Sequence, residues 1–350
     1  MAFPTASGHG NLPNGNFSPV IYSKKTQMAF RKSAVCEAIT NNDYFGEISN
    51  LGDTVHIIKE PEITVQNYER GTQIQAQDLS DDDFTLVVDK SLYFAFKVDD
   101  IEEKHSHVNW QSLATDRAGY RMKDSYDEEV LGYMSGYKRA AGVLHGPAGA
   151  ARVAGDKSGT DPIPVGADGF LASMHIDEGT FGGSGGTEIS ISADGTGTGV
   201  DATPLQIMNR MKRLLDQQQV PQDGRWFVGD PVFWEVLEDE DSKLVNRDFD
   251  QKGDTVLRNG LQFSGKLRGF QCYNSTNLPS IVGGPGAATS SSYGVLLAGH
   301  QAAVATANQI NKTESYRDPD SFADIVRGMN MYGRKILRPE ALTRAIYRII

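Results

Sequence analysis

The sequence predicts a protein of the α+β class, on three observations. Residues 51–98 are rich in Val, Ile, Thr and Tyr with a period of two, which is typical of strands. Residues 99–143 contain no proline and repeat apolar residues at every fourth position, which indicates one long helix. Residues 204–350 alternate short amphipathic stretches with short apolar runs and glycine turns. Strands and helices are therefore segregated along much of the chain.

The first fifty residues are expected to form an arm with one short helix. Residues 1–20 carry Gly, Pro, Asn and Ser without periodicity, which is typical of extended chain. Residues 24–40 place apolar side chains at helical spacings, and Asn41-Asn42-Asp43 ends that pattern.

Residues 51–98 are expected to form a long hairpin-like excursion. Arg70-Gly71 is a turn signal, and Pro61 indicates an edge strand or a bulge because proline cannot donate to a ladder. The last strand is expected to run for about 14 residues. Its apolar face comprises Leu86, Val88, Leu92, Phe94, Phe96 and Val98.

A helix of about 40 residues and about 60 Å is expected next, a strut too long for a compact core. Asp99 or Asp100 suits its N-cap, and Glu102 and Glu103 suit its first turn. Its apolar stripe is Trp110, Ala114, Ala118, Met122, Tyr126, Val130 and Met134.

A glycine-rich segment separates this strut from a second compact region. Residues 142–199 hold 15 of the 37 glycines, which predicts loops, turns and short strands such as EISIS at 188–192. Thr203-Pro204 is an N-cap followed by proline at the first helical position, and Asp230-Pro231 repeats that signal.

Composition narrows the class of protein. The chain is 39% hydrophobic and 23% charged, and no apolar run approaches the roughly 20 residues that span a bilayer. The start resembles no signal peptide, so the protein is expected to stay inside the cell, with no membrane partner. A net charge of −11 disfavours a protein that grips nucleic acid through clustered Lys and Arg. Cys36 and Cys272 are expected to be free and buried.

No residue pattern indicates catalysis, a cofactor or a metal site. His105 and His107 point about 200° apart on a helix, so they cannot hold one ion. Residues 149–158 have the wrong spacing for a phosphate loop, with Asp156 before Lys157. The acidic run at 238–241 is typical of a solvated helix end. The chain is therefore not expected to be an enzyme.

Several stretches in a fixed order resemble the major capsid proteins of tailed bacteriophages, which have the Hong Kong 97 (HK97)-type fold. They are FSPVIYSKKTQMAFRKSAVCEAITNNDYFGEI, GDTVHIIKEPEITVQNYERGTQI, LVVDKSLYFAFKVDDIE, GKLRGFQCYNSTNLP and ESYRDPDSFADIVRGMNMYGRKILRPEALTRAIYRI. The resemblance implies an N-terminal arm (1–50), an extended loop that lies over a neighbouring subunit (51–98) and a peripheral domain (99–203). The last would contain a spine helix (99–143) and the glycine-rich segment. It further implies an axial domain (204–310) and closing strands that return to the peripheral domain (311–350).

The resemblance also implies a function and partners. The chain would assemble into pentamers and hexamers of the icosahedral head of a tailed double-stranded DNA phage, in the host bacterial cytoplasm. Its partners would be other copies of itself, a separate scaffolding protein, a portal and a decoration protein, and it would enclose DNA without binding it specifically. No autocatalytic cross-link is expected. The glycine-rich segment is either an ornate loop or a platform for decoration proteins.

Charged residues of the extended loop are candidates for contacts between subunits. They would set register and partner choice by charge complementarity, and plain solvation of an exposed loop is the alternative for each. The candidates are Lys59, Glu60, Glu62, Glu69, Arg70, Asp81, Asp82 and Asp83.

Other functions remain open at this point. An encapsulin-type nanocompartment shares the fold and would carry a cargo enzyme in place of DNA. An enzyme with an unrecognised site, built on Trp226, Trp234 and acidic neighbours, would be a monomer with a ligand-dependent melting shift. An adhesin or tail fibre would show trimers and β-repeats, which the sequence lacks.

Overall fold

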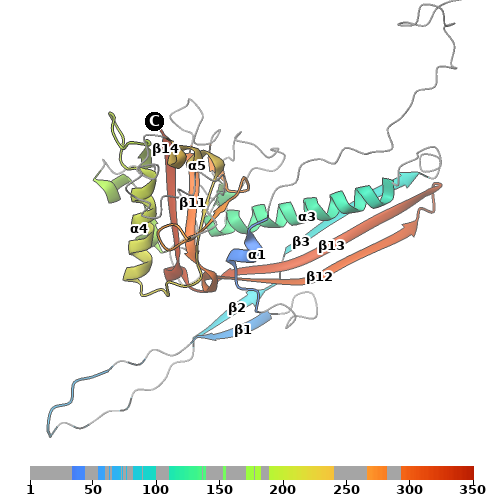
Figure 1. The fold of residues 1–350 in the computed structure, drawn as a ribbon. Coiled ribbons are helices and arrows are strands. Elements are labelled where there is room, and N and C mark those ends of the chain that lie inside the picture. Colours follow the sequence, from blue (N-terminus) through green and yellow to red (C-terminus); the bar gives the residue numbers. More distant parts are fainter. Residues whose placement is uncertain are drawn as a thin grey trace, which may run out of the picture.

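The structure is a computed structural model of the chain, in which a compact block carries two projections (Figure 1). One projection is a long helix with a three-stranded sheet, and the other is a hairpin that leaves from the base of that sheet. The described residues are 34–43, 54–59, 63, 65–71, 73, 76, 82–88, 90–99, 110–135, 137–138, 153–154, 171–176, 178–182, 189–239, 266–281 and 293–350. None of the described helices is long and apolar enough to cross a membrane.

A seven-stranded sheet forms the centre of the block. Its main path runs β6-β14-β11-β8-β9, with β10 paired to β11 and β7 paired to β14. Its strands are β6 (His175–Ile176), β7 (Ile189–Ile191), β8 (Arg225–Gly229), β9 (Gln271–Asn274), β10 (Ser280–Ile281), β11 (Tyr293–His300) and β14 (Leu342–Ile349). Every residue of β8 is buried, as expected of a central strand covered on both faces.

Two capped helices pack on this sheet, α4 (Pro204–Gln217) and α5 (Pro231–Glu238). Thr203 and Gln206 form a reciprocal capping box at the start of α4, which confirms the predicted start signal. The Asp230 side chain accepts from the Phe233 N–H and starts α5 in the predicted way. The ring centroids of Phe233 and Tyr347 lie 5.6 Å apart in a T-shaped contact, so α5 packs on β14 through aromatic edges.

Asp230 also accepts a hydrogen bond from the Tyr347 hydroxyl, in a site where burial raises the pKa of Asp230 to about 6. A raised pKa means that the folded state favours the protonated acid. The protonated Asp230 side chain therefore stabilises the folded state fully below about pH 4, and this stabilisation is lost as the pH rises through about 6. The loss amounts to about 3 kcal/mol, since one pKa unit corresponds to about 1.4 kcal/mol.

Asp230→Asn is therefore expected to raise the free energy of unfolding by about 3 kcal/mol at pH 8, because Asn keeps the cap and carries no charge. Below pH 4 the variant and the wild type should be equally stable. Urea unfolding between pH 4 and 8 measures the difference, and a constant difference across that range would contradict the assigned titration.

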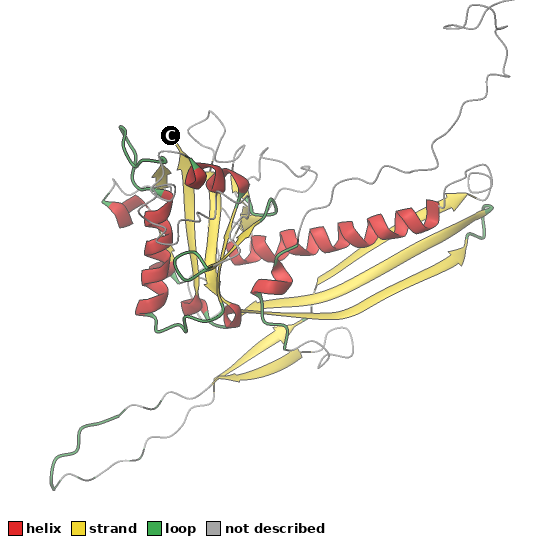
Figure 2. Cartoon of the chain, viewed as in Figure 1, coloured by secondary structure: helices red, strands yellow, loops and turns green. Residues whose placement is uncertain are grey.

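The three-stranded sheet lies beneath a long helix (Figure 2). The strand order is β12-β13-β3, with β12 at Val304–Arg317, β13 at Ala323–Ile336 and β3 at Lys90–Asp99. The helix, α3, spans Trp110–Ser135. On β13, the Arg334 guanidinium contacts Glu129 at 3.1 Å and stacks 4.6 Å from the Tyr133 ring. These contacts hold α3 on the sheet.

The predicted helix of about 40 residues is too long. The α3 helix has 26 residues, about 39 Å at 1.5 Å per residue, and the chain enters strand β4 (Tyr137–Lys138) soon after. Strand β4 pairs with β5 (Val153–Ala154). Arg344 donates to the Ser135 carbonyl at 2.7 Å, so a strand distant in sequence binds an end carbonyl of the helix. Residues 101–109 lie outside the described residues.

The predicted 14-residue strand is two strands in different sheets. β2 (Asp82–Val87) pairs with β1 (Thr54–Lys59), whereas β3 pairs with β13. The alternation itself is confirmed, because even-numbered side chains of β3 are half-buried and most odd-numbered ones are exposed. Of the predicted helix at 24–40, the described part is the single turn α1 (Cys36–Ile39).

The closing strands do not all lie beside α3. β12 and β13 do, but β14 returns to the seven-stranded sheet between β6 and β11. Part of the glycine-rich segment belongs to that sheet too, since β6 and β7 both pair in parallel with β14. This part of the segment therefore contributes to the core and is not merely an ornate loop.

Candidate assembly surfaces

The extended loop begins as a regular hairpin and continues as exposed chain. β1 and β2 pair in register from Thr54 opposite Val87 to Lys59 opposite Asp82. The described residues between 63 and 76 are in no strand of this chain. Arg70 and Gly71 form the predicted turn, and Gly71 has φ +98°, a conformation that glycine adopts without strain.

Three apolar side chains of this loop lie in water. Ile63 is 68% exposed, Val65 92% and Tyr68 67%. Burying such side chains on another surface would contribute about 1.5–3 kcal/mol each. Ile63, Val65 and Tyr68 therefore form an exposed apolar strip, which the described part of their own subunit does not cover.

The predicted charged contacts are only partly described. Glu69 and Arg70 are exposed beside Tyr68. Lys59 and Asp82 lie opposite each other in the β1–β2 register, and Asp83 lies opposite Ile58. Glu60, Glu62 and Asp81 lie outside the described residues. The candidates named from the sequence are all charged, and Ile63, Val65 and Tyr68 are not among them.

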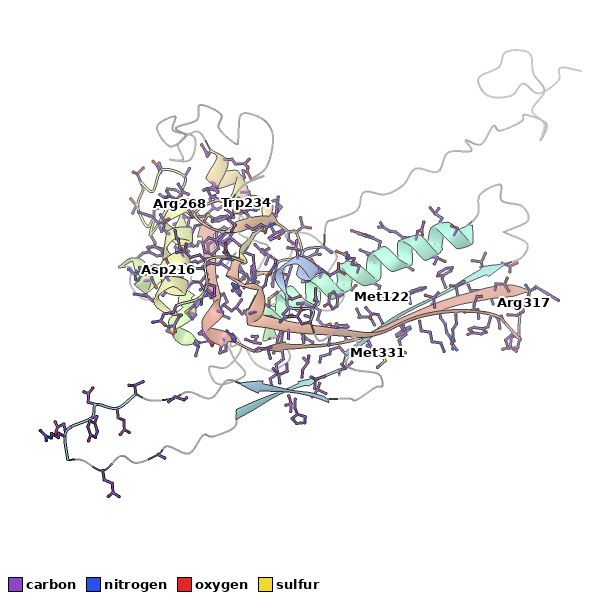
Figure 3. The ribbon with its side chains drawn as sticks, turned by 60° about the horizontal axis from the view of Figure 1, so that its bottom comes forward. Met122, Asp216, Trp234, Arg268, Arg317 and Met331 are labelled. Atoms are coloured by element: carbon purple, nitrogen blue, oxygen red, sulfur yellow. The ribbon has the colours of Figure 1, made fainter. Side chains whose placement is uncertain are left out.

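The three-stranded sheet has an open face on the side away from α3. Tyr93 on β3 is 83% exposed, and the side chain opposite it on β13, Met329, is 38% exposed. Tyr316, near the end of β12, is 42% exposed. In Figure 3, Arg317 marks the far end of this sheet, and the adjacent turn carries Phe322 at 79% exposure. This face is a second uncovered apolar surface.

Ion pairs link side chains of the open face and of its end turn. Arg327 donates to Glu314 at 2.8 Å and lies 5.0 Å above the Tyr316 ring. Lys312 also contacts Glu314, and the two cations lower the pKa of that carboxyl. Lys97 donates to Asp318 at 2.6 Å, which lowers the pKa of Asp318. These exposed pairs contribute little stability, but they hold the tyrosine ring and the end turn in place.

The segment that leads out of the arm is tied to α3 by a buried carboxylate. Asp127 accepts from the backbone N–H of Val35 at 2.7 Å and of Cys36 at 2.8 Å. The Asn277 amide bridges Asp127 at 2.9 Å and Asp124 at 3.0 Å. Asn41 then pairs with Ala305, on β12. The residues at the end of the arm, Val35 to Asn41, are therefore fixed to both α3 and β12.

Sequence reasoning missed this cluster because, beyond the first turn, it considered only the apolar stripe of the helix. A signal was present, since Asp127 lies three and four residues before Val130 and Leu131 and so shares their face. Both apolar residues and Asp127 are fully buried.

The described residues contain no group of three His, Cys, Asp or Glu side chains able to hold a metal ion. His105 and His107 lie outside them. Cys36 is buried and Cys272 half-buried, and both are free thiols. Burial raises the pKa of Cys272 to about 12 and that of Cys36 well above its usual value, so neither has the character of a nucleophile.

Comparisons with known proteins show the fold. No family model matches the chain, and no curated protein matches it by sequence. A solved chain of Mycobacterium phage Che8 superimposes with a TM-score of 0.65 at 22% identity, covering 95% of this chain and 97% of that one. The capsid of cyanophage P-SCSP1u gives 0.61 at 17% identity, with 95% and 93% covered.

The capsid of Ralstonia phage GP4 gives a TM-score of 0.61 at 12% identity, covering 99% of this chain and 98% of that one. The superpositions extend over nearly the whole of both chains, so the projections are matched along with the block. The chain therefore has the HK97-type fold of tailed-phage capsid proteins.

Proposed function

We propose that the chain is the major capsid protein of a tailed double-stranded DNA phage and that its partners are other copies of itself. The observation that carries this proposal is the exposed apolar strip of the extended loop, on a subunit whose fold matches phage capsid chains over nearly its whole length. A strip of this kind is covered when a neighbouring copy supplies a surface. Repetition in a closed shell then multiplies a modest contact many times.

The open face of the three-stranded sheet suits the loop of a neighbour. Both surfaces carry exposed apolar side chains, Val65 and Tyr68 on the loop and Tyr93 and Met329 on the sheet. A loop of one copy on the sheet of the next is a head-to-tail contact, and such contacts close into rings of five and six.

The two sheets of the chain would correspond to the two domains of a capsid subunit. The α3 helix with β3, β12 and β13 would be the peripheral domain, and the seven-stranded sheet with α4 and α5 would be the axial domain near the centre of each ring. On this division the axial domain includes β6, β7 and β14, so its sequence boundaries are discontinuous.

Other partners follow from the same function. A scaffolding protein would direct assembly in the host cytoplasm, a portal would fill one vertex, and a decoration protein would bind the outer surface. The net charge of −11 suits a wall that encloses DNA without gripping it.

Electron microscopy and analytical ultracentrifugation of the purified protein, over a range of concentration and salt, test the function. Rings of five or six copies or closed shells are expected, and nucleic acid inside shells from infected cells would distinguish a virion from a cargo compartment. A monomer under every condition would refute the proposal. Uniform closed shells from this chain alone would refute only the need for a scaffolding protein.

A further inference from the structure

The base of the extended loop rests on a small hydrophobic cluster of its own, separate from the main core. Leu86 and Val88 are buried there against Met331 and Leu337, with Val55 and Ile57 of β1 at its edge. In Figure 3, Met331 marks this place, at the base of the sheet near the hairpin. The loop is thus held by a few contacts at one end.

The sheet surface under this cluster is made of very small residues. Ala305 and Ala307 on β12 are buried in the cluster, and Ala307 lies opposite Gly333 on β13. Directly opposite partners in an antiparallel pair point to the same face, so the alanines and the glycine form one flat patch. The hairpin base lies on this patch.

Gly333 is a point of very close contact between the sheet and the hairpin. A Cβ placed on it would lie 2.4 Å from the Val87 carbonyl oxygen and 3.1 Å from the Val88 Cα. These are backbone atoms of the hairpin, so they cannot rotate away as the end of a side chain can. Gly333 does not have a positive φ, and its requirement for glycine is therefore steric and not conformational.

The strand register places this contact where the chain changes direction. β3 pairs with β13 only as far as Lys90, opposite Tyr332, which is the residue before Gly333. The chain that precedes β3 therefore leaves the edge of the sheet and crosses the face of β13 at the glycine. The Val87–Val88 peptide is the point from which the hairpin departs.

We propose that Gly333 is the positioning residue that sets the direction in which the extended loop leaves its subunit, and with it the angle between neighbouring subunits. The second half of this statement rests on the proposed function. Any side chain at 333 would lift Val87 and Val88 from the sheet by about 1 Å, the difference between the present approach and normal van der Waals contact. Because the loop extends well beyond the six residues of β1, it amplifies that lift to about 3 Å or more at Gln66.

The test is the distance between spin labels on Gln66→Cys and Asp116→Cys, two exposed sites on the loop and on α3. Of the native thiols, Cys36 is buried and Cys272 half-buried, so labelling is expected to favour the two introduced cysteines. Gly333→Ala is expected to shift the mean distance by about 3 Å or more in unassembled subunits, by the lever argument. Shells of that variant should then differ in diameter or fail to close.

Gly328→Ala is the matched control on the same strand. Its Cβ would meet the Phe94 ring, which is a movable side chain and is not part of the hairpin. This variant should lose stability without changing the distance. An unchanged distance in a folded Gly333→Ala subunit would overturn the proposal.

If Gly333→Ala does not fold, Leu86→Ala decides the question. Leu86 is fully buried in the small cluster, so its loss should broaden the distribution of distances. A distribution as narrow as that of the wild type would overturn the proposal. A wild type that never associates would refute the proposed function, and the distance shift would still test the direction of the loop.

Discussion

Replacing Asp127 with alanine is expected to lower the free energy of unfolding by about 3 kcal/mol, one of the largest effects of any polar substitution in this chain. The carboxylate is fully buried and accepts from two backbone N–H groups, at Val35 and Cys36. It also accepts from the Asn277 amide. Alanine would leave the two backbone N–H groups buried without this acceptor, and each carries a desolvation cost. It would also remove one of the two carboxylates that the Asn277 amide bridges.

Asp127→Asn is the matched comparison. Its amide oxygen still accepts from the α1 backbone, but its NH₂ group faces the NH₂ of Asn277, so we expect about half the loss. Urea unfolding measures both variants, and hydrogen exchange at Val35 and Cys36 shows whether α1 is released first. A loss below about 1 kcal/mol for the alanine variant would contradict the assigned role of the cluster.

Local signals were predicted well because their causes are local. The caps Thr203 and Asp230 and the turn at Arg70-Gly71 each depend on a few neighbouring residues, and the structure has all three. The alternation of β3 was also predicted, since a sheet with one covered face requires it.

The errors come from contacts distant in sequence. Nothing near Ser135 shows that Arg344 will bind its carbonyl. The apolar alternation from Leu86 to Val98 is interrupted only at Lys90, and this single polar residue does not show that the chain passes there from one sheet to another. Gly333 has no positive φ and no turn motif, so its importance is visible only once Val87 is seen above it.

The candidate contact residues of the extended loop show a second limit of prediction from sequence. Charged residues in an exposed loop draw attention, yet exposed charges stay solvated at no cost. The alternation of apolar residues in a predicted strand does not say which of them are buried within their own subunit. Val65 is 92% exposed, which only the folded structure shows.

Ile63→Asp together with Val65→Asp is expected to abolish association of the subunits and leave their folding unchanged. Burying the two native side chains on a neighbour would contribute about 4 kcal/mol per contact, which is about a thousandfold in the association constant. Two carboxylates on the same surface would add the cost of desolvating charge. Within one subunit both positions are exposed, so the melting temperature should not change.

Gln66→Asp is the control, since it adds the same type of charge at an exposed polar position beside Val65. It should assemble nearly as well as the wild type at physiological salt, where a single exposed charge is screened. Sedimentation at matched concentration separates the two hypotheses for this loop. If the control and the double variant lose assembly equally, the contact is governed by the charges first suspected, Glu69 and Arg70 among them. If only the double variant fails, the apolar strip holds the subunits together.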